Sequence, residues 1–145
     1  MTPEEAGAAL SAPLKAFNLN EVGSNTACWY TQRIDSTPPW IRYMVQDNKI
    51  VRVDVVAIKD DAGARRAPPV TSDEGITIDT PEQRVIKKYG SRAQISPHKY
   101  VEKALYLEIA SLDGKSGILF ETIDGKVETF RAGTIDAIRL VEGCS

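Results

Sequence analysis

Residues 79–90, DTPEQRVIKKYG, carry the pattern that decides the fold. Thr80 can cap a helix, Pro81 suits the first helical position, and Gln83 can reach back to the cap, which together make a capping box. Three apolar side chains then recur on one helical face: Val85, Ile86 and Tyr89. Gly90 is placed to end the helix. The stretch therefore predicts an amphipathic helix from about Thr80 to Gly90.

The start of the chain repeats this motif. Thr2-Pro3-Glu4-Glu5 predicts a second capped helix. Each helix is followed, at nearly equal spacing, by two strand-like runs that flank a turn, Asp47-Asn48 in the first copy and Asp124-Gly125 in the second. Another strand precedes each hairpin, Cys28–Gln32 and Leu105–Ile109. The sequence thus reads as the same unit written twice.

The predicted fold is α+β, with two tandem repeats of a helix followed by three antiparallel strands that form one compact domain. Repeat 1 covers about residues 1–57 and repeat 2 about residues 75–145. Between them, residues 58–74 are polar, contain Pro68-Pro69 and have no apolar period, which predicts a linker or exposed loop.

Composition excludes two classes of partner. The chain has 145 residues, with 18 basic and 20 acidic side chains, a net charge of −2 and a pI near 5.5. With this net charge the protein lacks the overall positive potential that attracts nucleic-acid phosphates, so no nucleic-acid partner is expected. No apolar run approaches the roughly 18 residues of a membrane helix, so no membrane span is expected either.

Two cysteines, Cys28 and Cys144, lie far apart and form no CxxC motif. They make either a long-range disulfide, which the residues favour, or two unrelated buried thiols. A disulfide predicts the periplasm or the extracellular space. The chain is then expected to lack the signal peptide of its precursor, which could also carry a lipid anchor.

No catalytic, cofactor or metal motif is present in the sequence. His98 is the only histidine, in a turn-like Ser96-Pro97-His98-Lys99-Tyr100 string without a recognisable nucleophile motif. A loop histidine that bonds to backbone is the expected role, and a hydrolase with a site near His98 is the less favoured alternative. No glycine-rich phosphate loop occurs, so no cofactor is expected.

Features of protein binding are more frequent than features of catalysis. Trp40 follows a stiff Pro38-Pro39 pair and is a candidate interface anchor, the alternative being a core plug. On the hairpin reading, six further residues lie on the sheet face opposite the predicted core, where Leu119, Glu121 and Ile123 pair with Phe130, Glu128 and Lys126. The predicted protein-binding residues are Trp40, Leu119, Glu121, Ile123, Glu128 and Phe130. The alternative is a solvated face with scattered hydrophobic side chains.

Six strings of the sequence carry a family resemblance: Thr80-Pro-Glu-Gln, Tyr89-Gly90, Pro97-His-Lys-Tyr100, the hairpin from Phe120 to Val127, Arg131-Ala-Gly133 and Glu142-Gly-Cys144. In these strings the chain resembles a group of uncharacterised secreted bacterial proteins and lipoproteins. The repeated helix-plus-hairpin plan is similar to the β-lactamase-inhibitor-protein fold and to outer-membrane assembly lipoproteins of the SmpA/OmlA kind. The resemblance implies a disulfide between Cys28 and Cys144 and action by binding proteins.

The sequence therefore predicts a non-enzymatic, extracytoplasmic protein-binding module, an inhibitor or immunity-type protein that blocks an envelope or secreted enzyme. An envelope-assembly or lipoprotein-like structural module is the alternative. A cleft-plugging inhibitor needs a projecting loop with an aromatic or acidic tip, for which Trp40 and the linker are the candidates.

Overall fold

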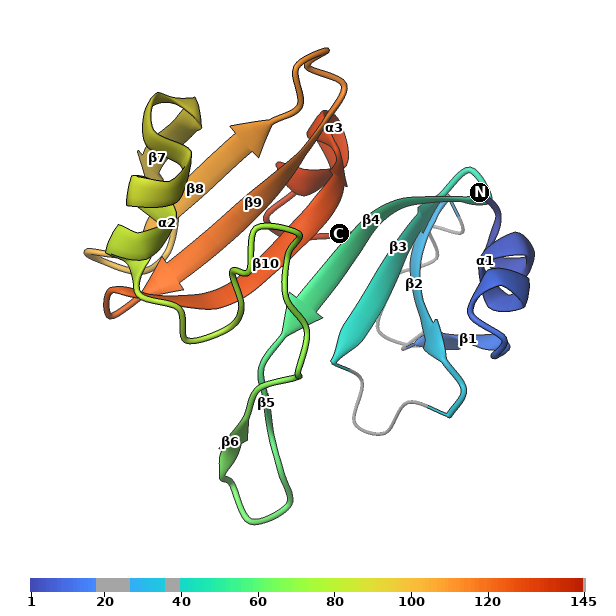
Figure 1. Cartoon of the computed structure of the whole chain (residues 1–145). Coiled ribbons are helices and arrows are strands. Elements are labelled where there is room, and N and C mark those ends of the chain that lie inside the picture. Colours follow the sequence, from blue (N-terminus) through green and yellow to red (C-terminus); the bar gives the residue numbers. More distant parts are fainter. Residues whose placement is uncertain (18–26, 36–39, 145) are drawn as a thin grey trace.

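A computed structural model describes residues 1–17, 27–35 and 40–144 of the chain. Its main element is one eight-stranded antiparallel sheet in the order β1-β2-β3-β4-β10-β9-β8-β7 (Figure 1). The strands of the first half are β1 (Leu14–Phe17), β2 (Cys28–Arg33), β3 (Ile41–Gln46) and β4 (Lys49–Val56). Those of the second half are β7 (Ala93–Pro97), β8 (Leu105–Ala110), β9 (Ser116–Ile123) and β10 (Lys126–Thr134).

Short helices cover both faces of this sheet. They are α1 (Pro3–Ala9), α2 (Glu82–Tyr89), the 3₁₀ turn η1 (Gly90–Arg92) and α3 (Ile135–Ile138). Residues alternate between the faces of a strand, and α2 packs on Leu107 and Phe120 whereas α3 packs on Tyr106 and Leu119. We call the side of α1 and α2 the helix face, and the side of α3 and the following residues to Cys144 the tail face.

The α+β class predicted from the sequence is confirmed, but the predicted repeat of one helix and three strands is not what the structure shows. Each half consists of a helix and a meander of four strands, because β1 and β7 add an outer strand to each side. The halves meet where β4 pairs with β10 in the centre of the sheet. Both added strands lie at the sheet edges, and β7 is largely exposed, so it lacks the apolar alternation that reveals a half-buried strand.

One predicted capping box forms and the other does not. The Thr2 hydroxyl accepts from the Glu5 amide at 3.2 Å, and the Glu5 carboxylate accepts from the Thr2 amide at 2.7 Å. Thr80, by contrast, does not cap α2, which begins at Glu82. Residues 79–81 are held against β10 by backbone bonds to Val127, and the Thr80 hydroxyl accepts from the Thr77 amide. This pairing keeps Thr80 extended and delays the helix.

Both predicted hairpin turns are confirmed as two-residue loops. Asp47 and Asn48 have φ of 48° and 58°, and Asp124 and Gly125 have φ of 51° and 72°, the positive values that a type I′ turn requires. Of the predicted pairs beyond the second turn, Ile123 with Lys126 is confirmed. The pairs further along are wrong, because a bulge shifts the register between Val127 and Thr129. As a result Leu119 lies opposite Arg131, and Phe130 lies opposite Phe120 in the main core.

Apolar clusters form on both faces of the sheet. The main cluster lies beneath α2 and includes Val85, Leu107, Phe120 and Phe130. On the tail face, Gly117 lets α3 approach, since a Cβ there would lie 3.0 and 3.2 Å from the side chains of Ile135 and Ile138. The predicted disulfide joins Cys28 to Cys144, with an S–S distance of 2.05 Å and a Cα separation of 5.3 Å. It closes the tail over the first half of the sheet.

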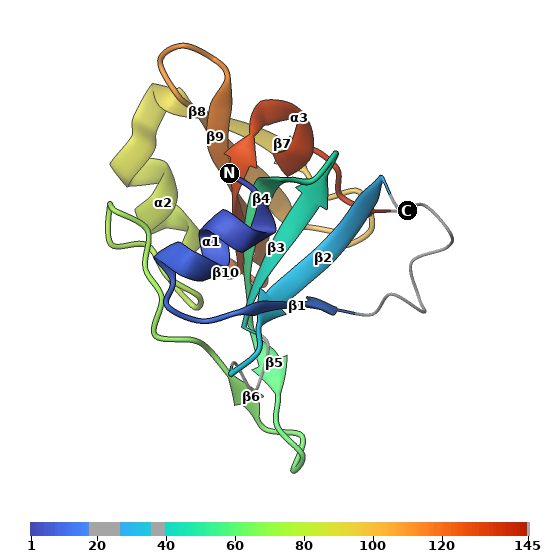
Figure 2. The same ribbon diagram turned by 90° about the vertical axis from the view of Figure 1, so that its right-hand side faces the viewer.

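The region predicted as a linker contains a hairpin of its own, β5 (Ile58–Lys59) paired with β6 (Arg65–Arg66). Two views at right angles show that it projects from the body of the protein (Figures 1 and 2). None of the helices within the described ranges has both the length and the apolar character that crossing a membrane requires.

Candidate functional site

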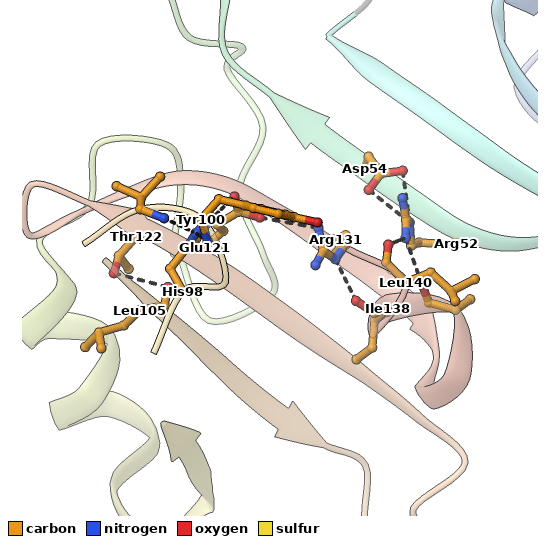
Figure 3. A network of polar contacts seen from close by, with 12 residues as sticks. Arg52, Asp54, His98, Tyr100, Leu105, Glu121, Thr122, Arg131, Ile138 and Leu140 are labelled. Atoms are coloured by element: carbon orange, nitrogen blue, oxygen red, sulfur yellow. Dashed lines mark hydrogen bonds and ion pairs between the residues drawn. The ribbon is translucent and has the colours of Figure 1, made fainter. Parts of the chain in front are cut away.

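Charged side chains cross the centre of the tail face in a row. Arg42 on β3 lies opposite Asp54 on β4, and Asp54 lies opposite Arg131 on β10. Arg52 lies two residues before Asp54 on β4. Its side chain is on the same face, because residues two apart in a strand point the same way. Asp54, Arg52 and Arg131 belong to polar contacts that also hold the tail (Figure 3).

Arg52 fastens the tail to the sheet. Its Nε lies 3.0 and 3.1 Å from the two carboxylate oxygens of Asp54. Its Nη1 donates to the carbonyl oxygens of Ala137 and Leu140, both at 2.8 Å, and its Nη2 donates to the Tyr30 hydroxyl at 2.6 Å. The guanidinium thus binds carbonyl groups at and after the C-terminal end of α3, a favourable place for a cation.

Arg131 binds the tail from the other half of the sheet. Its Nε donates to the Ile138 carbonyl oxygen at 2.7 Å, and its Nη1 lies 3.4 Å from Glu121 Oε2. The other oxygen of Glu121 lies 2.7 Å from His98 Nε2. The chain of contacts therefore runs from the tail through Arg131 and Glu121 to the loop after β7 (Figure 3).

His98 uses both ring nitrogens inside the protein. Its Nδ1 accepts from the backbone amides of Tyr100 and Val101, at 3.1 and 3.0 Å. Nδ1 is therefore the unprotonated nitrogen, and Nε2 carries the hydrogen donated to Glu121. The ring also stacks on Tyr106 at 4.6 Å between centroids. This histidine orders a loop, as the sequence predicted, and offers no free nitrogen for proton transfer.

Burial governs the electrostatics of this network. Burial raises the pKa of the Asp54 carboxyl, against the opposing attraction of Arg52, Arg131 and Arg42. Burial, followed by the charge of Arg52, lowers the pKa of Arg131. Both pKa shifts show that burial disfavours the charged forms of these side chains. The stability of the site therefore depends on the pairing of its charges with one another.

Within the described part of the chain, the buried polar atoms on this side of the sheet without a hydrogen-bond partner include the Gln32 carbonyl oxygen, the Trp40 indole nitrogen and Nη2 of Arg131. Gln32 is 5% exposed and Arg131 is 6% exposed. Buried polar groups are almost always paired, so these atoms are exceptions on the polar side of the sheet.

The projecting hairpin is the second candidate site. Asp60 organises its turn, because one carboxylate oxygen accepts from the amides of Ala62 and Ala64, at 3.1 and 2.8 Å. The other oxygen bonds Arg66 Nε at 2.9 Å. The next residue, Asp61, is exposed at the tip. The hairpin therefore presents a preformed, narrow end with one exposed aspartate, Asp61.

Arg65 fixes the base of the hairpin to the body. Its Nη1 bonds both oxygens of Asp79 at 2.8 Å, and its Nη2 bonds Glu128 at 2.9 Å. Because Glu128 is the extra residue of the β10 bulge, the irregularity in that strand turns a carboxylate toward the hairpin.

The structure separates the six predicted binding residues. Leu119 is 4% exposed beneath α3, and Phe130 is 5% exposed in the main core, so neither lies on an open surface. Glu121 belongs to the buried network, Glu128 to the base of the hairpin, and Ile123 is half-buried beside its turn. Trp40 is also half-buried and lies outside the three apolar clusters, whereas the prolines before it fall outside the described residues.

The sequence analysis missed Arg52, Asp54 and Arg131. A signal was present in Val51-Arg52-Val53-Asp54-Val55, where charged residues alternate with valines in a predicted strand. Such alternation indicates a strand with one polar face. It does not reveal that the C-terminal segment covers that face.

Within the described ranges, no three His, Cys, Asp or Glu side chains are placed to hold a metal ion. Comparisons of the chain with protein-family models, curated proteins and solved structures give no match.

Proposed function

We propose that the protein is a non-enzymatic, extracytoplasmic binding module of the inhibitor or immunity type, which inserts its β5–β6 hairpin into the cleft of a secreted or envelope enzyme. The observation that carries this proposal is the preformed hairpin, which projects from the body of the protein (Figure 2) and has Asp61 exposed at its tip. A binding loop that is already ordered loses little conformational entropy when it docks.

Two features of the hairpin support insertion into a cleft. The residues at its tip, Ala62, Gly63 and Ala64, have small side chains, so the end is narrow. Its base is held by Arg65, which bonds acidic side chains before α2 and on β10. The tip is therefore carried at a fixed place on the body, as an inhibitory loop must be.

The compartment is part of the same proposal. The disulfide between Cys28 and Cys144 persists only where thiols are not kept reduced, which favours the periplasm or the extracellular space. The shared order of a helix and four strands in the two halves supports an origin by duplication. It also supports kinship with the secreted bacterial group that the sequence resembles.

Photo-crosslinking tests the role of the hairpin. A photoreactive amino acid placed at Asp61 is expected to capture one predominant protein from a native envelope or secreted fraction. The matched control carries the same group at Leu112, which is fully exposed in the β8–β9 loop. The captured enzyme, purified, is expected to lose activity when the unmodified protein is added. Equal products from both positions, or a captured protein that binds without any effect on activity, would exclude hairpin-mediated inhibition.

A further inference from the structure

A cleft of about 510 Å³ lies on the helix face of the first half of the sheet, between α1 and β2 (Figure 1). Glu4, Gly7 and Ala8 line it from α1. They are spaced three and four residues apart, so they share one side of the helix. Trp29 and Thr31 line it from β2, where residues two apart point to the same face. The cleft is therefore built from one side of a helix and one face of a strand.

Small side chains on α1 leave this cleft open. The helix has the sequence Pro-Glu-Glu-Ala-Gly-Ala-Ala, without a large apolar side chain. In the second half, by contrast, α2 packs Val85, Ile86 and Tyr89 on the sheet. Trp29 therefore remains half-buried and lies outside the three apolar clusters. Its indole ring is a large apolar surface that an added aliphatic chain can cover.

Glu4 gives the cleft a negative charge. Among the described residues that line the cleft, Glu4 is charged and none is basic. Its side chain is exposed and takes part in no hydrogen bond or ion pair with the described part of the protein. The carboxylate is therefore available to a cation, and the Trp29 ring in the same cleft also attracts a cation. An anion would be repelled by Glu4.

We propose that this cleft binds the side chain of a lysine presented by a partner protein. The ammonium group pairs with Glu4, and the aliphatic stem lies on the Trp29 ring, beside the small residues of α1. Lysine fits because its charge is a compact group at the end of a flexible chain of methylene groups. The described residues that line the cleft include none of the β5–β6 hairpin, so the test of this proposal does not depend on the proposed inhibitory function.

Trp29 can report directly on this site. The chain has two tryptophans, so Trp40→Phe leaves Trp29 as the sole tryptophan and Trp29→Phe leaves Trp40. Titration of Trp40→Phe with Nα-acetyl-lysine amide is expected to change the fluorescence in a saturable way, whereas Trp29→Phe is expected to show no change. If Trp40→Phe does not fold, the indole N–H signal of Trp29 in the NMR spectrum of the wild type gives the same measurement. The absence of a saturable response from Trp29 would overturn the proposal.

Related probes identify the group that is recognised. Nα,Nε-diacetyl-lysine amide keeps the stem but lacks the charge, and ammonium chloride has the charge without the stem, so neither is expected to give a saturable response over the same concentrations. A short peptide with one lysine flanked by glycines is expected to bind at least as tightly as cadaverine, a free diamine. An equal response to the diacetylated compound would overturn the role of the charge, and tighter binding of cadaverine would overturn a protein side chain as its source.

Variants then locate the site. Ala8→Leu places a bulky side chain in the cleft and is expected to abolish saturable binding of Nα-acetyl-lysine amide. Ala9→Leu is the matched control, because Ala9 is also exposed on α1 but does not line the cleft. Glu4→Gln removes the charge and is expected to weaken binding about threefold, with the exposed Glu102, changed to Gln, as its control. Equal affinities within either pair of variants would overturn the assignment.

Discussion

Arg52 is the residue on which the tail face most depends. It bonds Asp54, Tyr30 and two carbonyl groups of the tail while remaining 4% exposed. Arg52→Met retains most of the volume but leaves a buried carboxylate without this partner. We expect a loss of about 3–5 kcal/mol in the free energy of unfolding, measured by chemical denaturation.

Arg33→Met is the matched control for that measurement. Arg33 also pairs with an aspartate, Asp35, but both side chains are exposed. Solvent screens such a pair, so its loss should leave the unfolding midpoint nearly unchanged. If the two variants lost equal stability, burial would not be the source of the effect.

Asp54 makes stability depend on pH in a direction unusual for a carboxylate. Its folded-state pKa is raised by burial, so the folded protein binds its proton more tightly than the unfolded chain does. The stability that Asp54 contributes is fully present below its unfolded pKa, near 3.8. It declines as pH rises through the higher folded pKa. The stability of the wild type minus that of Asp54→Asn should therefore fall with pH above about 4 and then level off.

Denaturation of both proteins at a series of pH values checks this expectation. A difference that rises with pH over the same range would mean that the pairing with Arg52 outweighs burial.

A substitution of His98 can distinguish a structural role of this residue from a catalytic one. His98→Ala removes the acceptor for two backbone amides and the donor to Glu121. We expect it to lower stability by about 1–3 kcal/mol. The biological activity should remain within about a factor of ten, since loss of a general acid or base would lower a catalysed rate by about 10²–10⁴. A thousandfold loss of function in the folded variant would instead support chemistry at this residue.

At the scale of the element, the hairpin between β5 and β6 depends on one carboxylate. Asp60→Ala removes the acceptor for the Ala62 and Ala64 amides, so these amides should exchange hydrogen with solvent faster. Asp61→Ala, one residue along, removes no such acceptor and should leave their exchange unchanged. Amide exchange measured by NMR compares the two variants, and equal exchange in both would show that Asp60 does not order the turn.

Local patterns in the sequence predicted the elements that are fixed by local chemistry. The Asp124-Gly125 turn and the Thr2 cap follow from bonds between residues a few positions apart. The start of α2 could not be predicted in this way, because Thr80 is held by pairing with β10, far along the chain. The bulge at Glu128 is equally hidden, and a shift of one residue there reversed the predicted face of Phe130.

At the scale of the whole molecule, the C-terminal tail covers its face of the sheet by contacting both halves of the sheet. Tail carbonyls bond Arg52 of the first half and Arg131 of the second, and Arg139 pairs with Glu108 on β8. The candidate site could not be predicted because no single segment contains it. The sequence showed the residue types, but only the fold places the tail beside them.

The disulfide completes this closure, since it joins β2 to the penultimate residue across a sequence separation of 116. In the chain-entropy model, closing a loop of that length lowers the entropy of the unfolded chain and so raises the free energy of unfolding by about 5 kcal/mol. Removal of a native disulfide typically lowers the free energy of unfolding by about 2–5 kcal/mol. We expect the Cys28→Ser, Cys144→Ser double variant to lose free energy of unfolding within this range, as measured by chemical denaturation. Because Arg52 and Arg131 still hold α3, its native NMR spectrum should change only near the two serines. Loss of the α3 signals would mean that the bond, and not the arginine contacts, holds the tail on the sheet.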